Sequence, residues 1–469
     1  MKSCRALILL AVLALMLPSN VEAGSPAPEN VDVFAFVRAL DEAGARKVWP
    51  GFDTSAWPLA VFDGERTYLF RHPSPPPEFT AVPDHPGVLS MLGRHPAVVG
   101  NSTRDLGGVR TATVLVTSDR NVENSLLACV EEVFHVFWLD RHPGFRPDEM
   151  ARYGYPLEDL DNLRTLLAED EALARALEAD TDSRAAAWAA AALRLRSERR
   201  PRLPAEVRSF EAALEMMEGT ANFAARFALG ESPAKTASRL RQGHLAEAIR
   251  WRFYDSGAAL CFLLDRFEPD WKNRLDARPA LTTPDLLGEV LGPRGLRPAE
   301  FSRAEADEFR AAAEKDIADL TNRRRRLEEE LEGRAGTRVV IEAADGAEPL
   351  HLQRFDPIHL FVLENGRVAH ENFLALAAPA GTIEMTNPGF ARGSFEGMVG
   401  LTVPAGRHPF AEGIRRLTIF GIPAEPRLVR AEGAVSLEAP GLRVSLKGAA
   451  VVNEGRTIRL VVGDRPPRD

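Results

Sequence analysis

The sequence predicts an α+β protein, in which a mainly helical region with a mixed α/β part at its amino-terminal end is followed by a β-sandwich. Three features support this class. Short apolar segments and proline-rich loops alternate up to residue 117, alanine- and leucine-rich tracts with helical spacing follow between 126 and 332, and short alternating segments fill the chain after Gly336. An apolar fraction of 45% over 469 residues is ample for two or three domains with hydrophobic cores.

The amino terminus has the layout of a cleavable secretory signal. Lys2 and Arg5 precede an apolar run at 6–17, and Ala23 supplies a small residue at the end. We therefore expect residues 1–23 to be removed and the mature protein to be secreted or periplasmic. The apolar run is shorter than the ~20 residues that span a bilayer. No later segment reaches that length, so we expect no stable membrane insertion.

The charge balance gives no reason to expect nucleic acid as a partner. The formal net charge is -9, from 58 basic and 67 acidic residues. Removal of Lys2, Arg5 and Glu22 with the signal leaves 56 basic and 66 acidic residues, a net charge of -10. A phosphate backbone binds to basic surfaces, and this composition does not favour one.

Residues 24–300 are expected to form one region whose first part mixes helix and strand. Apolar residues at helical spacing predict a helix over 31–46, and β-forming residues predict a strand over 111–117. That strand lies immediately before the next predicted helix. We expect its edge to lie beside an extended peptide and to pair with it through backbone hydrogen bonds.

The most informative segment is the apolar run from Leu126 to Leu139, which holds Glu131, Glu132 and His135. In a helix, residues four apart share one face, so Glu131 and His135 converge while Glu132 lies one step around the cylinder. This is the geometry of the zinc-binding motif His-Glu-x-x-His, in which two imidazoles hold the metal and the glutamate activates water. Here a carboxylate replaces the first imidazole.

A second acidic stripe lies on a helix predicted over 205–229. Its members share spacings of four, three and four residues, and they are Glu211, Glu215, Glu218 and Asn222. Glu218 is the best third metal ligand, because Gly219 lets a neighbouring helix approach closely. Glu211 and Glu215 have an alternative role in salt bridges to nearby arginines. Further scaffold helices are predicted over 157–200 and 245–267.

The remainder of the chain is predicted to be a connector and a second domain. Residues 301–335 form a highly charged helical connector whose charges belong to a solvated face. Residues 336–469 form the β-sandwich, with a two-residue hairpin turn at Asn365-Gly366. The sequence does not identify a partner for this domain.

Several segments together resemble secreted bacterial zincin-like metallopeptidases. They are Glu131 to Trp138, Tyr155-Pro156, Glu218-Gly219-Thr220-Ala221, and Tyr254-Asp255-Ser256-Gly257 to Asp270-Trp271-Lys272, and the resemblance covers residues 30 to 280. In that family, a His-Glu-x-x-His helix is completed by the glutamate of a downstream Glu-Gly-x-Ala helix. The resemblance implies that Glu131, His135 and Glu218 hold zinc, that Glu132 is the general base, and that the substrate is a peptide or protein.

Glu131 departs from the family pattern, and the departure has a chemical consequence. Two glutamates and one histidine place two negative charges on the metal instead of one, which lowers its Lewis acidity and raises the pKa of bound water. We therefore expect weakened peptidase activity. Carboxylate ligands also suit manganese, which is the alternative to zinc.

Other interpretations remain open from the sequence. The chain is alternatively a catalytically silent binding or scaffold protein, in which Glu131 and His135 form an ordinary buried pair. Tyr254 is either an oxyanion-stabilising catalytic residue or a tyrosine packed at a helix start. A di-iron bundle needs a second Glu-x-x-His motif, and the sequence contains none. Cys129 and Cys261 are either buried free thiols or a disulfide between two core helices.

Overall fold

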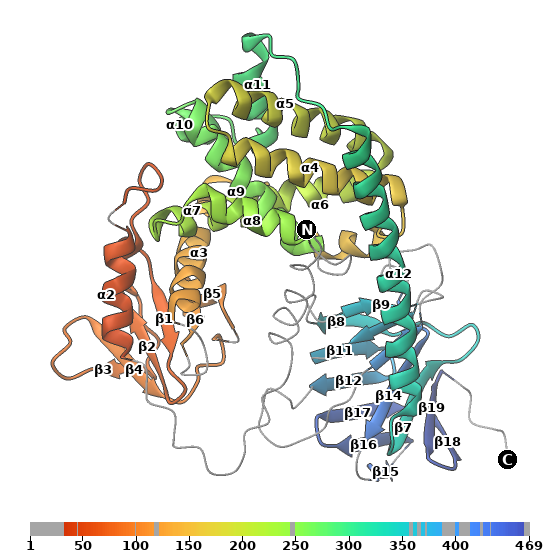
Figure 1. Ribbon diagram of the computed structural model, residues 1–469. Helices are drawn as coiled ribbons and strands as arrows, with labels where there is room; N and C mark the ends of the chain where they lie inside the picture. Colours follow the sequence, from red (N-terminus) through yellow and green to blue (C-terminus); the bar gives the residue numbers. More distant parts are fainter. Residues whose placement is uncertain are drawn as a thin grey trace, which may run out of the picture. The chain divides into compact units, whose positions relative to one another are not determined.

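The computed structural model shows a mixed α/β protein (Figure 1). It describes residues 32–44, 46–98, 100–116, 122–243, 249–355, 360–363, 367–370, 373–386, 399–402, 413–422, 425–431 and 433–463. The predicted signal, 1–23, lies outside these residues. The chain divides into two compact units, one of Met1–Ala45 with Asp53–Val133 and the other of Arg46–Phe52 with Phe134–Asp469.

No helix within the described ranges is long and apolar enough to cross a membrane.

The first unit contains a helix and a six-stranded mixed sheet. Helix α2 (Val33–Gly44) buries the apolar side predicted from its spacing, and Phe34 contacts the rings of Tyr68 and Phe70 on the sheet. The described strands run in the order β3-β4-β2-β1-β6-β5. Their bounds are β1 Leu59–Phe62, β2 Arg66–Phe70, β3 Thr80–Ala81, β4 Val88–Leu92, β5 Ser102–Leu106 and β6 Val109–Leu115. Among the described strands of this sheet, only β1 and β6 pair in parallel.

The predicted strand at 111–117 is present as β6, but it is not an edge strand. It pairs with β1 on one side and with β5 on the other. Gly107 and Gly108, both with positive φ, turn the chain sharply between β5 and β6, so β5 folds back over that edge. The edge beside which a peptide was expected to lie therefore belongs to β5.

The second unit contains a series of helices that follow one another in the sequence (Figure 1). After α3 (Val122–Arg141) they are α4 Leu160–Glu178, α5 Asp182–Arg199, α6 Ala205–Leu214, α7 Thr220–Ala228, α8 Pro233–Gln242, α9 Ile249–Phe267, α10 Trp271–Asp276 and α11 Thr283–Leu291. A single π-helical segment, η5 (Glu215–Gly219), joins α6 to α7. Short 3-10 segments are η3 Glu149–Gly154, η4 Arg200–Arg202 and η7 Gly292–Arg294, with η2 Thr54–Ala56 in the first unit.

An aromatic cluster packs the carboxyl-terminal half of α3 into the second unit. Trp49 meets the rings of Phe134, Trp138 and Trp271 at centroid distances of 5.6, 5.2 and 5.0 Å. Edge-to-face contacts of this kind stabilise aromatic pairs beyond the area they bury. They hold in place the part of α3 that carries His135.

The charged connector is the long helix α12 (Arg303–Gly333), close to its predicted bounds. Ser302 begins it with a capping box to Glu305, which satisfies backbone donors in the first turn. Most of its residues are exposed, and pairs such as Arg310–Glu314 lie one turn apart, as expected for a solvated face.

The carboxyl-terminal region is rich in strands, which form two sheets. One contains β18-β19-β7-β14-β13-β10-β9 and the other contains β15-β16-β17-β12-β11-β8, in those orders among the described strands. The bounds are β7 Thr337–Ala343, β8 His351–Phe355, β9 Leu360–Val362, β10 Arg367–His370, β11 Phe373–Ala378, β12 Gly381–Thr386, β13 Val399–Thr402, β14 Arg416–Ile422, β15 Arg427–Ala431, β16 Ala434–Ala439, β17 Leu442–Lys447, β18 Ala450–Glu454 and β19 Thr457–Val462. The predicted turn at Asn365-Gly366 lies outside the described residues, but β9 and β10 on either side of it pair antiparallel.

Candidate functional site

Helix α3 carries three of the predicted site residues. His135 is buried, with 7% of its surface exposed, whereas Glu131 and Glu132 are half-buried. The hydroxyl of Thr103, on the edge strand β5, donates to the backbone carbonyl of Glu132 at 3.2 Å and lies 3.4 Å from its carboxylate. The edge of the sheet in the first unit therefore lies beside the predicted general base.

The structure brings His135 and Glu218 together. Nε2 of His135 lies 3.1 Å from Oε2 of Glu218, although 83 residues separate them. Glu218 is 6% exposed. A buried carboxylate at hydrogen-bond distance from an imidazole supplies two of the three ligands that the metal-site hypothesis requires.

The backbone around Glu218 has a conformation that the sequence did not predict. Residues Glu215–Gly219 form a π-helical turn, in which an extra residue is accommodated between α6 and α7. Such turns are rare and occur frequently at functional sites. The extra residue changes the direction in which the acidic side chains project after Leu214.

Gly219 has the role expected of it. A Cβ atom at Gly219 would lie 2.5 Å from Cα of Gly257 and 3.1 Å from the carbonyl oxygen of Phe253, both on α9. The reciprocal Cβ at Gly257 would lie 2.6 Å from Cα of Gly219. The two backbones are in direct contact, which confirms that the glycine permits a close helix approach beside Glu218.

The other acidic residues of the stripe pair with arginines. Glu211 accepts from Arg199 at 2.6 Å, and Glu215 accepts from Arg196 at the same distance. Ser256 also donates to Glu215, at 2.6 Å. The salt-bridge alternative is thus confirmed for Glu211 and Glu215, and the described contacts join only Glu218 of these three acids to His135.

These pairs belong to a larger buried network that the sequence did not reveal. Its members share burial and mutual contact, and they are Glu169, Asp170, Arg196, Arg199, Glu211, Glu215 and Arg252. Burial would raise the pKa of Glu169, but the charges of Arg196, Arg252 and Arg199 hold it well below its usual range. We call this set the arginine–carboxylate network. Its ion pairs link residues of α4, α5, α6, η5 and α9.

Arg250 on α9 is the other partner of Glu218. Its Nη2 atom donates to Oε1 of Glu218 at 2.8 Å and lies 3.1 Å from Oε1 of Glu149. Burial would raise the pKa of Glu218, but the charge of His135, a hydrogen bond with it and the charge of Arg250 lower that pKa to about 2. Glu218 is therefore ionised across the physiological pH range.

Tyr254 lies one helical turn after Arg250 and is half-buried. Its hydroxyl accepts a hydrogen bond from Arg250 and forms a further one with Glu218. Its ring contacts that of Trp251 at 5.0 Å. The hydroxyl thus points toward Arg250 and Glu218, and the aromatic ring packs beside the exposed Trp251.

Cys129 and Cys261 are buried free thiols. The disulfide alternative is therefore wrong, and the buried-thiol alternative describes both residues. Burial raises the pKa of each thiol, so neither is suited to act as a nucleophile.

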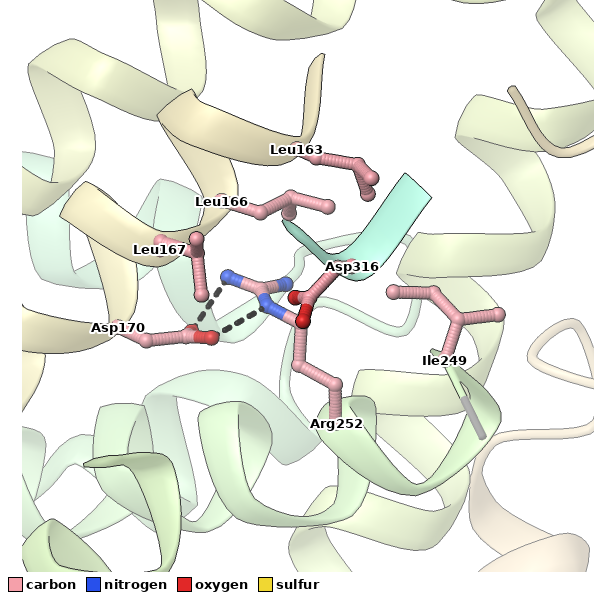
Figure 2. Close-up of a pocket in the computed structure, with 7 residues that line it drawn as sticks. All are labelled: Leu163, Leu166, Leu167, Asp170, Ile249, Arg252 and Asp316. Atoms are coloured by element: carbon pink, nitrogen blue, oxygen red, sulfur yellow. Dashed lines mark hydrogen bonds and ion pairs between the residues drawn. The ribbon is translucent and has the colours of Figure 1, made fainter. Parts of the chain in front are cut away.

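A small hollow lies elsewhere in the second unit, where α4, α9 and α12 meet (Figure 2). Its volume is about 20 Å³, which suffices for about one water molecule. It is lined by Leu163, Leu166, Leu167, Asp170, Ile249, Arg252 and Asp316. Arg252 is held there by Asp170, and none of the predicted site residues contributes to the hollow (Figure 2).

In the portion of the chain that the structure describes, no three His, Cys, Asp or Glu side chains are gathered as a metal-holding group. Comparison with protein-family models, with curated proteins and with solved structures finds no match to this chain.

Proposed function

We propose that the protein is a secreted or periplasmic zincin-like metallopeptidase homologue that acts on a peptide or protein substrate. In this proposal Glu131, His135 and Glu218 hold a zinc ion, with manganese as the alternative, and Glu132 is the general base. The contact between Nε2 of His135 and Oε2 of Glu218 is the observation that carries the proposal.

The separation of these two atoms fits a shared metal ion. Two ligand atoms at 2.0–2.2 Å from a tetrahedral zinc lie about 3.4 Å apart. The observed separation is 3.1 Å. A movement of a few tenths of an ångström would admit the ion, and both atoms are of types that zinc prefers.

The sheet of the first unit is arranged to support peptide binding beside Glu132. Strand β5 ends the sheet in the described order, so its outer edge offers backbone donors and acceptors to an extended peptide. The Thr103 hydroxyl fixes that strand against the backbone of Glu132. A peptide that pairs with β5 would thus lie along the helix that carries the base.

The side chains have distinct roles in the proposed hydrolysis. A bound metal ion supplies Lewis-acid polarisation of water and of the scissile carbonyl. Glu132 accepts the proton of the attacking water and returns it to the leaving amine. Tyr254 would turn its hydroxyl proton from Glu218 to the oxygen that becomes negative. The helix contact at Gly219 holds Glu218 in place beside His135.

The two carboxyl-terminal sheets are proposed to form a β-sandwich. Side chains from both sheets, such as Ile341 of β7 and Leu437 of β16, belong to one hydrophobic cluster. This region would bind a partner or substrate rather than supply catalytic residues.

A second function, a catalytically silent binding or scaffold protein, is favoured by one observation. Arg250 already provides Glu218 with a buried positive charge at 2.8 Å. A carboxylate that is paired with both an imidazole and a guanidinium is satisfied by protein groups alone. Together with the weaker Lewis acidity expected from Glu131, this pairing is consistent with a fold that has lost its chemistry.

Metal analysis of the purified mature protein distinguishes the two functions. The protein is incubated with zinc or manganese, desalted and analysed for bound metal by mass spectrometry. The metallopeptidase proposal expects about one ion per chain, lost in Glu218→Gln. Glu211→Gln is the matched control, because Glu211 lies on the same stripe but pairs with Arg199. Absence of stoichiometric metal in the unmodified protein would support the silent function.

A further inference from the structure

Arg250 lies between two carboxylates from different elements. Its guanidinium contacts Glu218 of η5 at 2.8 Å and Glu149 of η3 at 3.1 Å, and it also donates to the hydroxyl of Tyr254. Only 8% of the residue is exposed. A buried guanidinium keeps its charge, so its position is determined by these acceptors.

The two oxygens of Glu218 have different partners. Oε1 accepts from Arg250 and Oε2 contacts Nε2 of His135. A metal ion bound on the His135 side would therefore share one carboxylate with a fixed positive charge. Like charges at such separations repel strongly where water is excluded.

We propose that Arg250 competes with the metal ion for the charge of Glu218 and thereby sets the metal affinity of the site. The inference rests on the proposed function. Arg250 acts through Glu218, so it is a positioning residue rather than a catalytic one.

Glu149 makes this competition reversible. It contacts Nε of Arg250 at 3.1 and 3.3 Å as well as Nη2, so it can retain the guanidinium when Glu218 turns its charge to a metal. The Glu149 side chain is 22% exposed, more than the 8% of Glu218. Arg250 therefore has two alternative partners, one deeply buried and one closer to solvent.

The test is the zinc dissociation constant, measured by competition with a chromophoric chelator at neutral pH. Arg250→Gln keeps a hydrogen-bond donor but removes the charge, so zinc should bind more tightly, by roughly 10-fold or more, because the repulsion between two nearby cations is removed. Arg250→Lys keeps the charge and should bind zinc as the unmodified protein does. Arg252→Gln is the matched control on the same helix, because Arg252 pairs with Glu169 and Asp170 and not with Glu218.

Glu149→Gln tests the same inference in the opposite direction, because it should lower the zinc affinity. This variant also keeps the buried cation, Arg250. Without Glu149, Arg250 is held more firmly by Glu218, so zinc should bind more weakly. Circular dichroism of each variant establishes that the helices are retained before binding is compared.

The outcomes separate this inference from the proposed function. Tighter binding in Arg250→Gln with weaker binding in Glu149→Gln supports the competition. Where the unmodified protein binds too weakly to measure, zinc binding that becomes measurable in Arg250→Gln but not in Arg252→Gln supports it. Equal or weaker binding in Arg250→Gln, beside measurable binding in the unmodified protein, overturns the competition and leaves the metal site intact. Absence of zinc binding in every variant overturns both.

Discussion

Substitution of Gly219 by alanine tests the close helix contact beside Glu218. The new Cβ would lie 2.5 Å from Cα of Gly257, whereas carbon atoms in contact lie about 3.5–4.0 Å apart. The backbones of η5 and α9 would therefore have to separate by about 1 Å. Because the obstructing atoms are backbone atoms, rotation of a side chain cannot relieve the clash.

The magnitude follows from two opposing effects. Overpacking of a tight interior costs about 1–3 kcal/mol, and replacement of glycine within a helix regains about 1 kcal/mol. We expect a net loss of up to about 2 kcal/mol, a fall of roughly 4–8 °C in the melting temperature of the helical part. A 1 Å displacement would also carry Glu218 beyond hydrogen-bond distance of His135, from 3.1 Å, and weaken metal binding.

Thermal unfolding followed by circular dichroism measures the effect, with Gly288→Ala as the control. Gly288 also lies in a helix, but a Cβ there meets only Leu193, at 4.0 Å. That variant should be as stable as the unmodified protein or more so. The reasoning is refuted if Gly219→Ala matches Gly288→Ala in both melting temperature and zinc affinity.

The remaining predictions concern catalysis, pH and thiols. Glu131→His should raise peptide hydrolysis in the zinc-loaded protein, and a variant that binds zinc without any gain would argue against Glu132 as the base. The pKa of Glu218 is lowered from 4.5 to about 2, so its ion pairs stabilise the fold above pH 4.5 and that contribution is lost as the pH falls towards 2; Glu218→Gln should flatten this part of the profile of melting temperature against pH. Burial raises the pKa of Asp316 above 3.8, so its ionisation disfavours the fold as the pH rises, and Asp316→Asn should increase the melting temperature at neutral pH but not below pH 3.8. Thiol labelling should reach Cys129 and Cys261 only after unfolding, and a reductant should leave the melting temperature unchanged; a shift on reduction would indicate a disulfide.

Local spacing was sufficient to predict part of the site. The i, i+4 relation places Glu131 and His135 on one face of α3, and a glycine directly after Glu218 indicates a close helix contact. Both are properties of a few adjacent residues. The structure adds the contact between His135 and Glu218, which the spacing alone left as one choice among the acids of the stripe.

Long-range partners could not be predicted in the same way. Arg250 is 32 residues from Glu218 on another helix, and no pattern near either residue joins them. The same holds for the arginine–carboxylate network, where Arg196 reaches Glu169 across 27 residues from a tract that resembled plain scaffold. Burial of such charges depends on how helices pack, which sequence periodicity does not specify.

The edge strand β5 was missed for a different reason. Its sequence includes Arg104 and Asp105, both exposed, and lacks the apolar alternation by which strands are recognised. Exposed charges are typical of edge strands, because they discourage pairing with other chains. After Gly336, the alternation of buried residues by which strands are recognised is clear in β17, whereas β15 is almost wholly exposed and shows no such alternation.

Because of the π-helical turn at Glu215–Gly219, the number of residues in this segment cannot change without disturbing the packing of α7. Removal of one residue would restore ordinary α-helical phase and rotate all of α7 by about 100° relative to α6. Asn222 and Phe223, both buried, would then leave their present neighbours. A one-residue deletion here should therefore be far more damaging than one in an exposed loop, and related chains that retain the site should keep the number of residues between Leu214 and Thr220 unchanged.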